Sequence, residues 1–263
     1  MKTQNIEAQD YFSIEAKNYY ARHYENINSE TSYPSLYLRH QYVLKMLDPI
    51  KNGKALDIGC GSGAMVRDLL NRGYDVVAAD ISKDMLNATR NTVKTHPRAA
   101  HVRYSIQDIE KLSFASETFD LIICTGVIEY LKSDDNALGE LARVLKPNSI
   151  ALISTQNKVS LVRVIEEFFW QISPIWLKRR IFTFKQHHCH TPWKLDRALA
   201  KVGLVKEDFA YHHFYPIPIP FDRLVPRFCV WAGKKMERWS KSKYAWMVAT
   251  GYLVKVRKRE ISK

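Results

Sequence analysis

The residues with the clearest chemistry surround a glycine-rich turn, LDIGCGSG, at residues 56–63. Glycines let a backbone pass close to a ligand, and a helix that starts here offers unpaired N–H groups. The glycines follow a G-x-G-x-G spacing, which differs from the G-x-G-x-x-G turn of dinucleotide sites. An acid precedes them, and a carboxylate is unfavourable beside a pyrophosphate. An acid suits a cationic amino group instead. We expect such a ligand to contact Asp57, Gly59, Cys60 and Gly61.

Two further acids follow the next two apolar stretches. Asp80 stands 21 residues after Gly59, where a carboxylate can accept both hydroxyls of a ribose, and Ile81 adjoins it. Asp108 occupies the corresponding place after the third stretch, and it suits the amino group of an adenine, with Ile109 offering a backbone N–H. Together these residues predict a site for an adenosine that lacks phosphates and carries a zwitterionic tail.

Apolar stretches alternate with helical patterns along the residues that must position this site. A helix is expected at 35–47, strands at 54–58, 75–79, 102–106, 120–125 and 149–155, and helices at 64–72, 82–95 and 133–144. Beyond residue 157 we expect amphipathic helices at 159–172 and 193–202, then strands at 204–215 and 246–257 that complete the sheet. This order predicts an α/β fold with a doubly wound, seven-stranded, mostly parallel sheet.

The motifs resemble those of class I S-adenosylmethionine-dependent methyltransferases, within the ubiquinone-biosynthesis-like, methyltransferase type 11 group. They are LDIGCGSG, VVAADIS, IQDIEKLSF, FDLIICTGVIEYL and RVLKPNSIALIST, in order within residues 36–155. The resemblance implies a Rossmann-like methyltransferase fold and S-adenosyl-L-methionine as cofactor. It also implies that Arg39, 20 residues before Gly59, meets the cofactor carboxylate, and that Cys124 and Thr125 line the sulfonium side.

One motif departs from the family. Ubiquinone-type relatives with an E-x-x-E-H arrangement are thought to bind a metal there, whereas this chain has Gly126 and Tyr130 at two of those positions. We therefore expect no metal, and the departure puts a ubiquinone-type substrate in doubt. The HHCH run at residues 187–190 is not read as a zinc site, because adjacent residues rarely close a tetrahedron.

An oxygen acceptor also needs a base. The candidate bases are histidines at positions 187, 188, 190, 212 and 213, and His190 and His213 are the two expected near strand ends. The alternative for each is an ordinary polar loop histidine. Tyr19, Tyr20 and Tyr24 are candidates for a lid over the cofactor, and their alternative is ordinary packing. We accordingly divide the chain into a lid segment (1–35), a cofactor-binding core (36–157) and a substrate cap with the last two strands (158–263).

Charge is divided unevenly along the chain. Residues 1–157 hold 18 basic and 19 acidic side chains, whereas residues 158–263 hold 22 basic and eight acidic ones, a net of +14, together with all six tryptophans. Three interpretations compete: docking on an anionic membrane surface, binding of nucleic acid, or a substrate cap with a solvated outer face. Binding of nucleic acid would be favoured by an appended RNA-binding module, and we recognise none in the sequence.

The sequence thus predicts an enzyme that methylates a small hydrophobic or lipid-linked acceptor, at an oxygen and at a membrane surface. A soluble small molecule or sugar, RNA, and a non-enzymatic scaffold remain alternatives. The chain starts without an apolar secretory signal, and its four cysteines form no C-x-x-C pair, so we expect a cytoplasmic protein that lies peripherally on the inner face of the membrane. The acceptor and the oligomeric state stay open.

Overall fold

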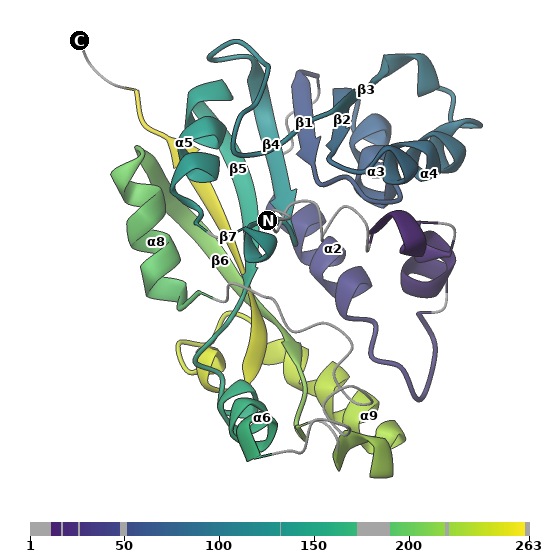
Figure 1. Cartoon of the computed structure of the whole chain (residues 1–263), viewed down its shortest axis with the longest axis vertical. Coiled ribbons are helices and arrows are strands. Elements are labelled where there is room, and N and C mark those ends of the chain that lie inside the picture. The colour runs from purple at the N-terminus through teal and green to yellow at the C-terminus, as the bar shows by residue number, and fades with distance from the viewer. Residues whose placement is uncertain are drawn as a thin grey trace.

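The computed structural model describes residues 12–16, 18–25, 27–47, 52–131, 133–172, 190–218 and 221–260. Its centre is a seven-stranded sheet with the order β3-β2-β1-β4-β5-β7-β6 (Figure 1). The strands are β1 (Lys54–Ile58), β2 (Asp75–Asp80), β3 (Val102–Ile106), β4 (Phe119–Thr125), β5 (Leu145–Gln156), β6 (Leu204–Phe214) and β7 (Ala249–Lys258). The first five are parallel and β7 runs antiparallel to both β5 and β6, which confirms the predicted fold class.

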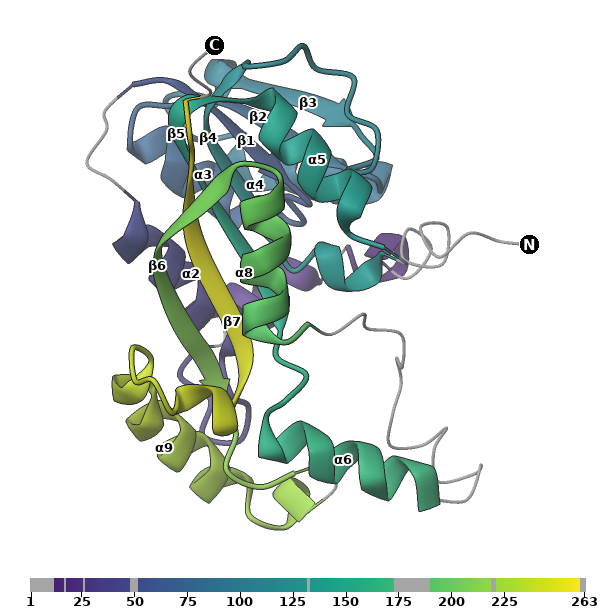
Figure 2. The same cartoon turned by 90° about the vertical axis from the view of Figure 1, so that its left-hand side faces the viewer.

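Helices cover both faces of this sheet. The α-helices of the described residues are α2 (Ser35–Met46), α3 (Ala64–Asn71), α4 (Lys83–Val93), α5 (Asp135–Val144), α6 (Leu161–Ile172), α8 (Pro192–Lys201) and α9 (Pro226–Met236). One apolar core joins the sheet to α2, α3 and α4, and a second joins its other face to α5 and α8. Figure 2 shows α5 and α8 in front of the sheet and α2 to α4 behind it.

Local sequence signals account for several helix starts. The Ser82 hydroxyl accepts the N–H of Met85 at 3.3 Å and caps α4, as an N-cap residue does. Thr191 caps α8 in the same way, and Pro192 occupies the first turn, where a missing N–H costs nothing. The strands between these helices are buried on both faces, so they read as continuous apolar runs rather than alternating ones.

The last two strands differ in detail from expectation. β7 begins at Ala249, three residues later than the pattern suggested, because Ala245–Met247 form a short 3-10 turn. β6 and β7 pair along almost their full length, with a register shift in β6 between Lys206 and Asp208. A single sheet therefore includes strands from both the 36–157 and the 158–263 segments.

Helices α6 and α9 lie beyond the lower ends of β6 and β7 in both views (Figures 1 and 2). The helix expected at 159–172 is amphipathic, with Leu161, Ile165, Phe168 and Ile172 on one stripe. In the structure this stripe faces solvent rather than a core: its members are exposed by 51%, 41%, 60% and 64%, in the same order. Periodicity identified this helix correctly, but it did not indicate what the apolar face contacts.

None of the helices in the described part of the chain is long and apolar enough to cross a lipid bilayer.

Candidate functional site

A cavity of about 420 Å³ lies at the carboxyl ends of β1, β2, β4 and β5 and continues to the neighbouring ends of β6 and β7. Ligands of open α/β sheets bind at this edge. We call its two parts the glycine-turn half, around Asp57, Gly61 and Asp80, and the histidine half. The histidine half is bordered by Glu129, Gln156, Arg163, His212 and His213.

The glycine turn brings the backbone close to its surroundings. Gly59 has a φ of 74°, and a Cβ there would overlap the side chain of Val127. Gly63, with a φ of 84°, begins α3, and a Cβ there would lie 2.8 Å from the Thr89 methyl group. Only glycine combines positive φ with this lack of space, so the turn is fixed by its own sequence.

Two buried acids form the polar centre of the glycine-turn half. Asp80 accepts the N–H of Gly61 at 3.1 Å and that of Ser82 at 2.9 Å, and burial raises its pKa to about 6 against these hydrogen bonds. Asp57 is 3% exposed and its Oδ2 has no hydrogen-bond partner. Burial, then the charge of Asp80, raises the pKa of Asp57 to about 7. An unpartnered buried carboxylate requires a cation or a donor, so this atom is suited to an amino group.

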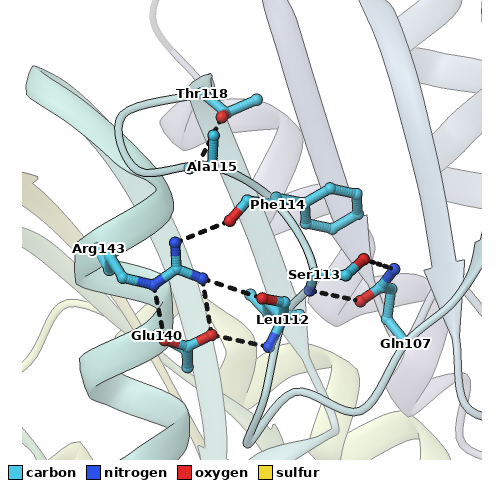
Figure 3. Close-up of polar contacts among 8 residues, drawn as sticks. All are labelled: Gln107, Leu112, Ser113, Phe114, Ala115, Thr118, Glu140 and Arg143. Atoms are coloured by element: carbon cyan, nitrogen blue, oxygen red, sulfur yellow. Dashed lines mark hydrogen bonds and ion pairs between the residues drawn. The ribbon is translucent and has the colours of Figure 1, made fainter.

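The loop after β3 supplies the next wall of the cavity. Asp108 and Ile109 line it beside Gln107. Arg143 on α5 donates to the carbonyls of Leu112, at 3.0 Å, and Phe114, at 2.7 Å, while Glu140 accepts the Leu112 N–H at 2.7 Å (Figure 3).

Nearer the cavity, Gln107 bridges to Ser113 through both of its amide atoms, at 2.7 and 3.0 Å (Figure 3). The loop is therefore held at both ends, which fixes the backbone around Asp108.

The N-terminal segment closes the cavity from outside the sheet. Tyr19, Tyr24 and Arg39 line it, whereas Tyr20 lies outside it and stacks on Tyr24 at 5.5 Å. The Arg39 guanidinium lies against Gly126, where a Cβ would be 2.7 Å from its Nη1. Glycine at 126 thus leaves room for Arg39 beside the end of β4.

Ten of the eleven predicted cofactor residues border this one cavity. They are Arg39, Asp57, Gly59, Cys60, Gly61, Asp80, Ile81, Asp108, Ile109 and Thr125. Cys124 does not: it is fully buried in the core shared with α5, because its side chain points to the opposite face from that of Thr125.

The predicted histidines do not all border the cavity. His213 borders the cavity, but its ring stacks on Tyr33 at 5.3 Å. His190 does not reach the cavity: it is 1% exposed, bridges to Asn157, and lies 3.5 Å from the Asp134 carboxylate. His187 and His188 lie outside the described residues.

His212, by contrast, borders the cavity and is 6% exposed, and neither ring nitrogen has a hydrogen-bond partner. Burial, then the charge of Arg39, holds its pKa well below the usual range, so the imidazole is neutral at pH 7.

Glu129 and Arg163 complete the histidine half. Neither was among the predicted site residues, although Glu129 lies in the FDLIICTGVIEYL motif. Glu129 is 4% exposed, and its Oε2 has no partner. Burial raises the pKa of this carboxyl, while Arg39 and then Arg163 oppose the shift. Arg163 belongs to α6, which was predicted only as an amphipathic helix. Folding places this helix beside β7 and so brings Arg163 to the cavity.

Comparison with known proteins identifies the domain. Residues 56–153 match the family described as methyltransferase domain, type 11. The chain carries a class I S-adenosylmethionine-dependent methyltransferase domain. Its cofactor is S-adenosyl-L-methionine.

Two curated relatives of this methyltransferase domain show the range of the family. The chain is 39% identical over 111 residues, 42% of its length, to the biotin biosynthesis bifunctional protein BioHC of Cellvibrio japonicus, of which it spans 21%. It is 27% identical over 175 residues, 66% of its length, to the ubiquinone biosynthesis O-methyltransferase of Rhizobium etli, of which it spans 68%.

Solved structures share the fold of this methyltransferase domain. Haemonchus contortus phosphoethanolamine N-methyltransferase 2, with phosphomonomethylethanolamine and S-adenosylhomocysteine, has a TM-score of 0.58 at 20% identity, over 85% of this chain and 53% of that one. The [4+2]-cyclase SpnF has a TM-score of 0.65 at 14% identity, over 98% and 97%. Since the fold also occurs in a cyclase, the reaction must be argued from the site.

Proposed function

We propose that this protein transfers a methyl group from S-adenosylmethionine to an oxygen of a small hydrophobic or lipid-linked acceptor, at the surface of an anionic membrane. The proposal rests on one continuous cavity, in which a half suited to the cofactor opens directly into a half with unpartnered polar groups. A ubiquinone O-methyltransferase and a malonyl-[acyl-carrier protein] O-methyltransferase among the relatives also support an oxygen acceptor.

In the glycine-turn half, the chain binds and orients the cofactor. Asp57 would hold the cationic amino group, Asp80 the ribose hydroxyls and Arg39 the carboxylate. The cofactor, when bound, supplies a methyl group already activated on a sulfonium. The protein therefore contributes mainly position, by aligning the acceptor oxygen, the methyl carbon and the sulfonium for in-line displacement. Tyr19 and Tyr24 would cover the site and exclude water.

The histidine half supplies a proton acceptor. Among the predicted histidines, His212 combines access to the cavity with ring nitrogens that lack partners. Because its imidazole is neutral at pH 7, it can accept a hydrogen bond, and then the proton, from an acceptor hydroxyl. We assign this role to His212 in place of His190, and His213 is the second choice because its ring stacks on Tyr33.

The surface of α6, α9 and the turn before α9 supports docking on a membrane. Exposed apolar side chains gather on these elements: Leu161, Val164, Ile165, Phe168, Ile172, Phe221, Leu224, Val225, Phe228 and Trp231. We call this set the apolar face. Arg227, Lys234, Lys235, Arg238 and Lys243, all exposed, accompany it. Apolar side chains beside basic ones complement the acyl boundary and headgroups of an anionic bilayer.

A transfer assay tests the function. Purified protein is incubated with methyl-labelled S-adenosylmethionine and a cell extract that contains membranes, and label is measured in organic, aqueous and macromolecular fractions. Label in the organic fraction, lost in Asp57→Asn, is the expected result. Label among aqueous small molecules would indicate that the acceptor is soluble and not lipid-linked. Label on RNA would favour the nucleic-acid interpretation, and cofactor binding without any labelled product would indicate a scaffold.

A further inference from the structure

Among the side chains of α6 that the structure describes, Arg163 is the one that borders the cavity, and it is charged. It lies in the first turn of the helix, between the buried Val162 and the exposed Val164, and it is half-buried. One of its Nη atoms donates to the Gln156 side chain, while its buried Nε has no hydrogen-bond partner. No carboxylate of the described residues forms an ion pair with it. A buried guanidinium edge without an acceptor is costly unless a ligand supplies one.

The surroundings of Arg163 leave its charge unbalanced. Arg163 shifts the pKa of two cavity groups: that of His213, which burial and then Arg163 lower to about 4, and that of Glu129. His212 is also neutral. If Arg39 holds the cofactor carboxylate, then the histidine half contains Arg163 and the cofactor's sulfonium against the single carboxylate of Glu129. One further negative charge would bring these buried charges into balance.

We propose that the methyl acceptor carries an anionic oxygen group, a carboxylate or a phosphate, and that Arg163, oriented by Gln156, binds it in the histidine half. A planar guanidinium with Nε available presents parallel donors to such a group. The outward neighbours of Arg163 on α6 would contact an apolar remainder of the same molecule. This inference rests on the proposed methyl transfer and specifies its acceptor.

The test uses protein loaded with S-adenosylhomocysteine and probes that differ only in the head group: decanoate, decyl phosphate and the neutral decanamide. Calorimetry should show that at least one acid binds about tenfold or more tightly than decanamide, as expected for a charge-assisted pair. Arg163→Gln should remove this preference and leave S-adenosylhomocysteine affinity unchanged. Lys158→Gln, an exposed cation outside the cavity just before α6, is the control that should keep the preference.

The two acids separate the two head groups: tighter binding of decyl phosphate assigns a phosphate, and equal or tighter binding of decanoate assigns a carboxylate. Equal affinity for acid and amide, no binding of either acid, or an unchanged preference in Arg163→Gln would overturn the inference. Loss of S-adenosylhomocysteine binding in the wild-type protein would instead contradict the proposed function, so the two failures are distinguishable.

Discussion

His212 on β6 lies directly opposite Gly251 on β7, and its imidazole fills the space that a Cβ at position 251 would occupy. The ring therefore packs against the backbone of Gly251, in a space that any side chain at position 251 would fill. Strand pairing sets which residue faces His212, and the glycine at that position decides where the ring can lie.

Gly251→Ala should displace His212 from the cavity. We expect a loss of about 1–3 kcal/mol in the free energy of unfolding, from overpacking, and a fall in methyl transfer comparable to that of His212→Ala. Denaturant melts and transfer rates measure the two effects. Gly139→Ala is the control: nothing lies within 4 Å of its Cβ position on α5, so stability should rise by about 0.5–1 kcal/mol. Full activity in Gly251→Ala would contradict the role of His212.

Asp80→Asn should weaken cofactor binding. The carboxylate is fixed by backbone N–H groups and would accept the ribose hydroxyls, and hydrogen bonds to a charged group contribute about 1.5–3 kcal/mol. Calorimetry with S-adenosylhomocysteine should show a loss of roughly tenfold to a hundredfold. Asp75→Asn changes the exposed residue at the opposite end of the same strand and should bind normally. Unchanged affinity in Asp80→Asn would mean that the ribose lies elsewhere.

The pKa of Asp57 predicts two opposite pH effects. Its pKa rises from 3.8 to about 7 on folding, so the folded protein holds this proton more tightly than the unfolded chain. The contribution of Asp57 to the free energy of unfolding should therefore fall as pH increases through that window. Cofactor affinity should change in the other direction, because the amino group pairs with the ionised acid.

Calorimetric titrations from pH 5.5 to 8.5 test the binding effect. Affinity for S-adenosylhomocysteine should rise by up to about tenfold per pH unit below 7 and level off above it. Asp57→Asn should bind more weakly and lose most of this dependence, leaving the smaller contribution of Asp80, whose pKa is about 6. A wild-type affinity that is flat across the range would exclude this assignment of Asp57.

Arg143→Met should loosen the loop that carries Asp108. It removes the hydrogen bonds to Leu112 and Phe114 and the ion pair with Glu140, so we expect a loss of about 1–3 kcal/mol in stability. Amide exchange in residues 107–118 should accelerate, and S-adenosylhomocysteine should bind severalfold more weakly. Arg67→Met removes an exposed arginine on α3 and should change neither. Normal exchange in Arg143→Met would show that the loop is held by Gln107 and Ser113 instead.

The apolar face should bind anionic vesicles. We expect the protein to co-sediment with phosphatidylglycerol vesicles at low salt and to be released as salt increases. Phe168→Ser combined with Trp231→Ser should weaken sedimentation, as should Lys234→Glu with Lys235→Glu. Ile106→Ser is the control, because Ile106 is also 60% exposed but lies on β3, away from the face. Wild-type protein that stays in the supernatant at low salt would rule out membrane docking.

The glycine-turn half was predictable because its parts are encoded locally. Asp57 and Asp80 lie at the ends of β1 and β2, Asp108 follows β3, and in a parallel sheet the ends of successive strands meet at one edge. The five strands β1, β2, β4, β5 and β7 were likewise predictable from apolar runs, while β3 and β6 are more polar. The position of β7 between β5 and β6 was not, since strand order depends on packing between segments distant in the chain.

The histidine half depends on contacts that no local pattern carries. Arg163 and His212 are almost fifty residues apart and meet Glu129 only when α6 and β6 pack around the end of β4. His190 was expected near a strand end, but its bridge to Asn157 holds it away from the cavity. Helical period indicated an apolar stripe on α6, yet period alone cannot distinguish a core contact from a solvent-facing surface.

The register shift in β6 has a consequence for solubility. β6 is an edge strand of the sheet, and a long regular edge offers unpaired backbone groups to any other chain. The irregularity between Lys206 and Asp208, with charged side chains on both sides of it, interrupts the pattern that a second strand would have to match. The strand that supplies His212 thus also protects the molecule against aggregation through its open edge.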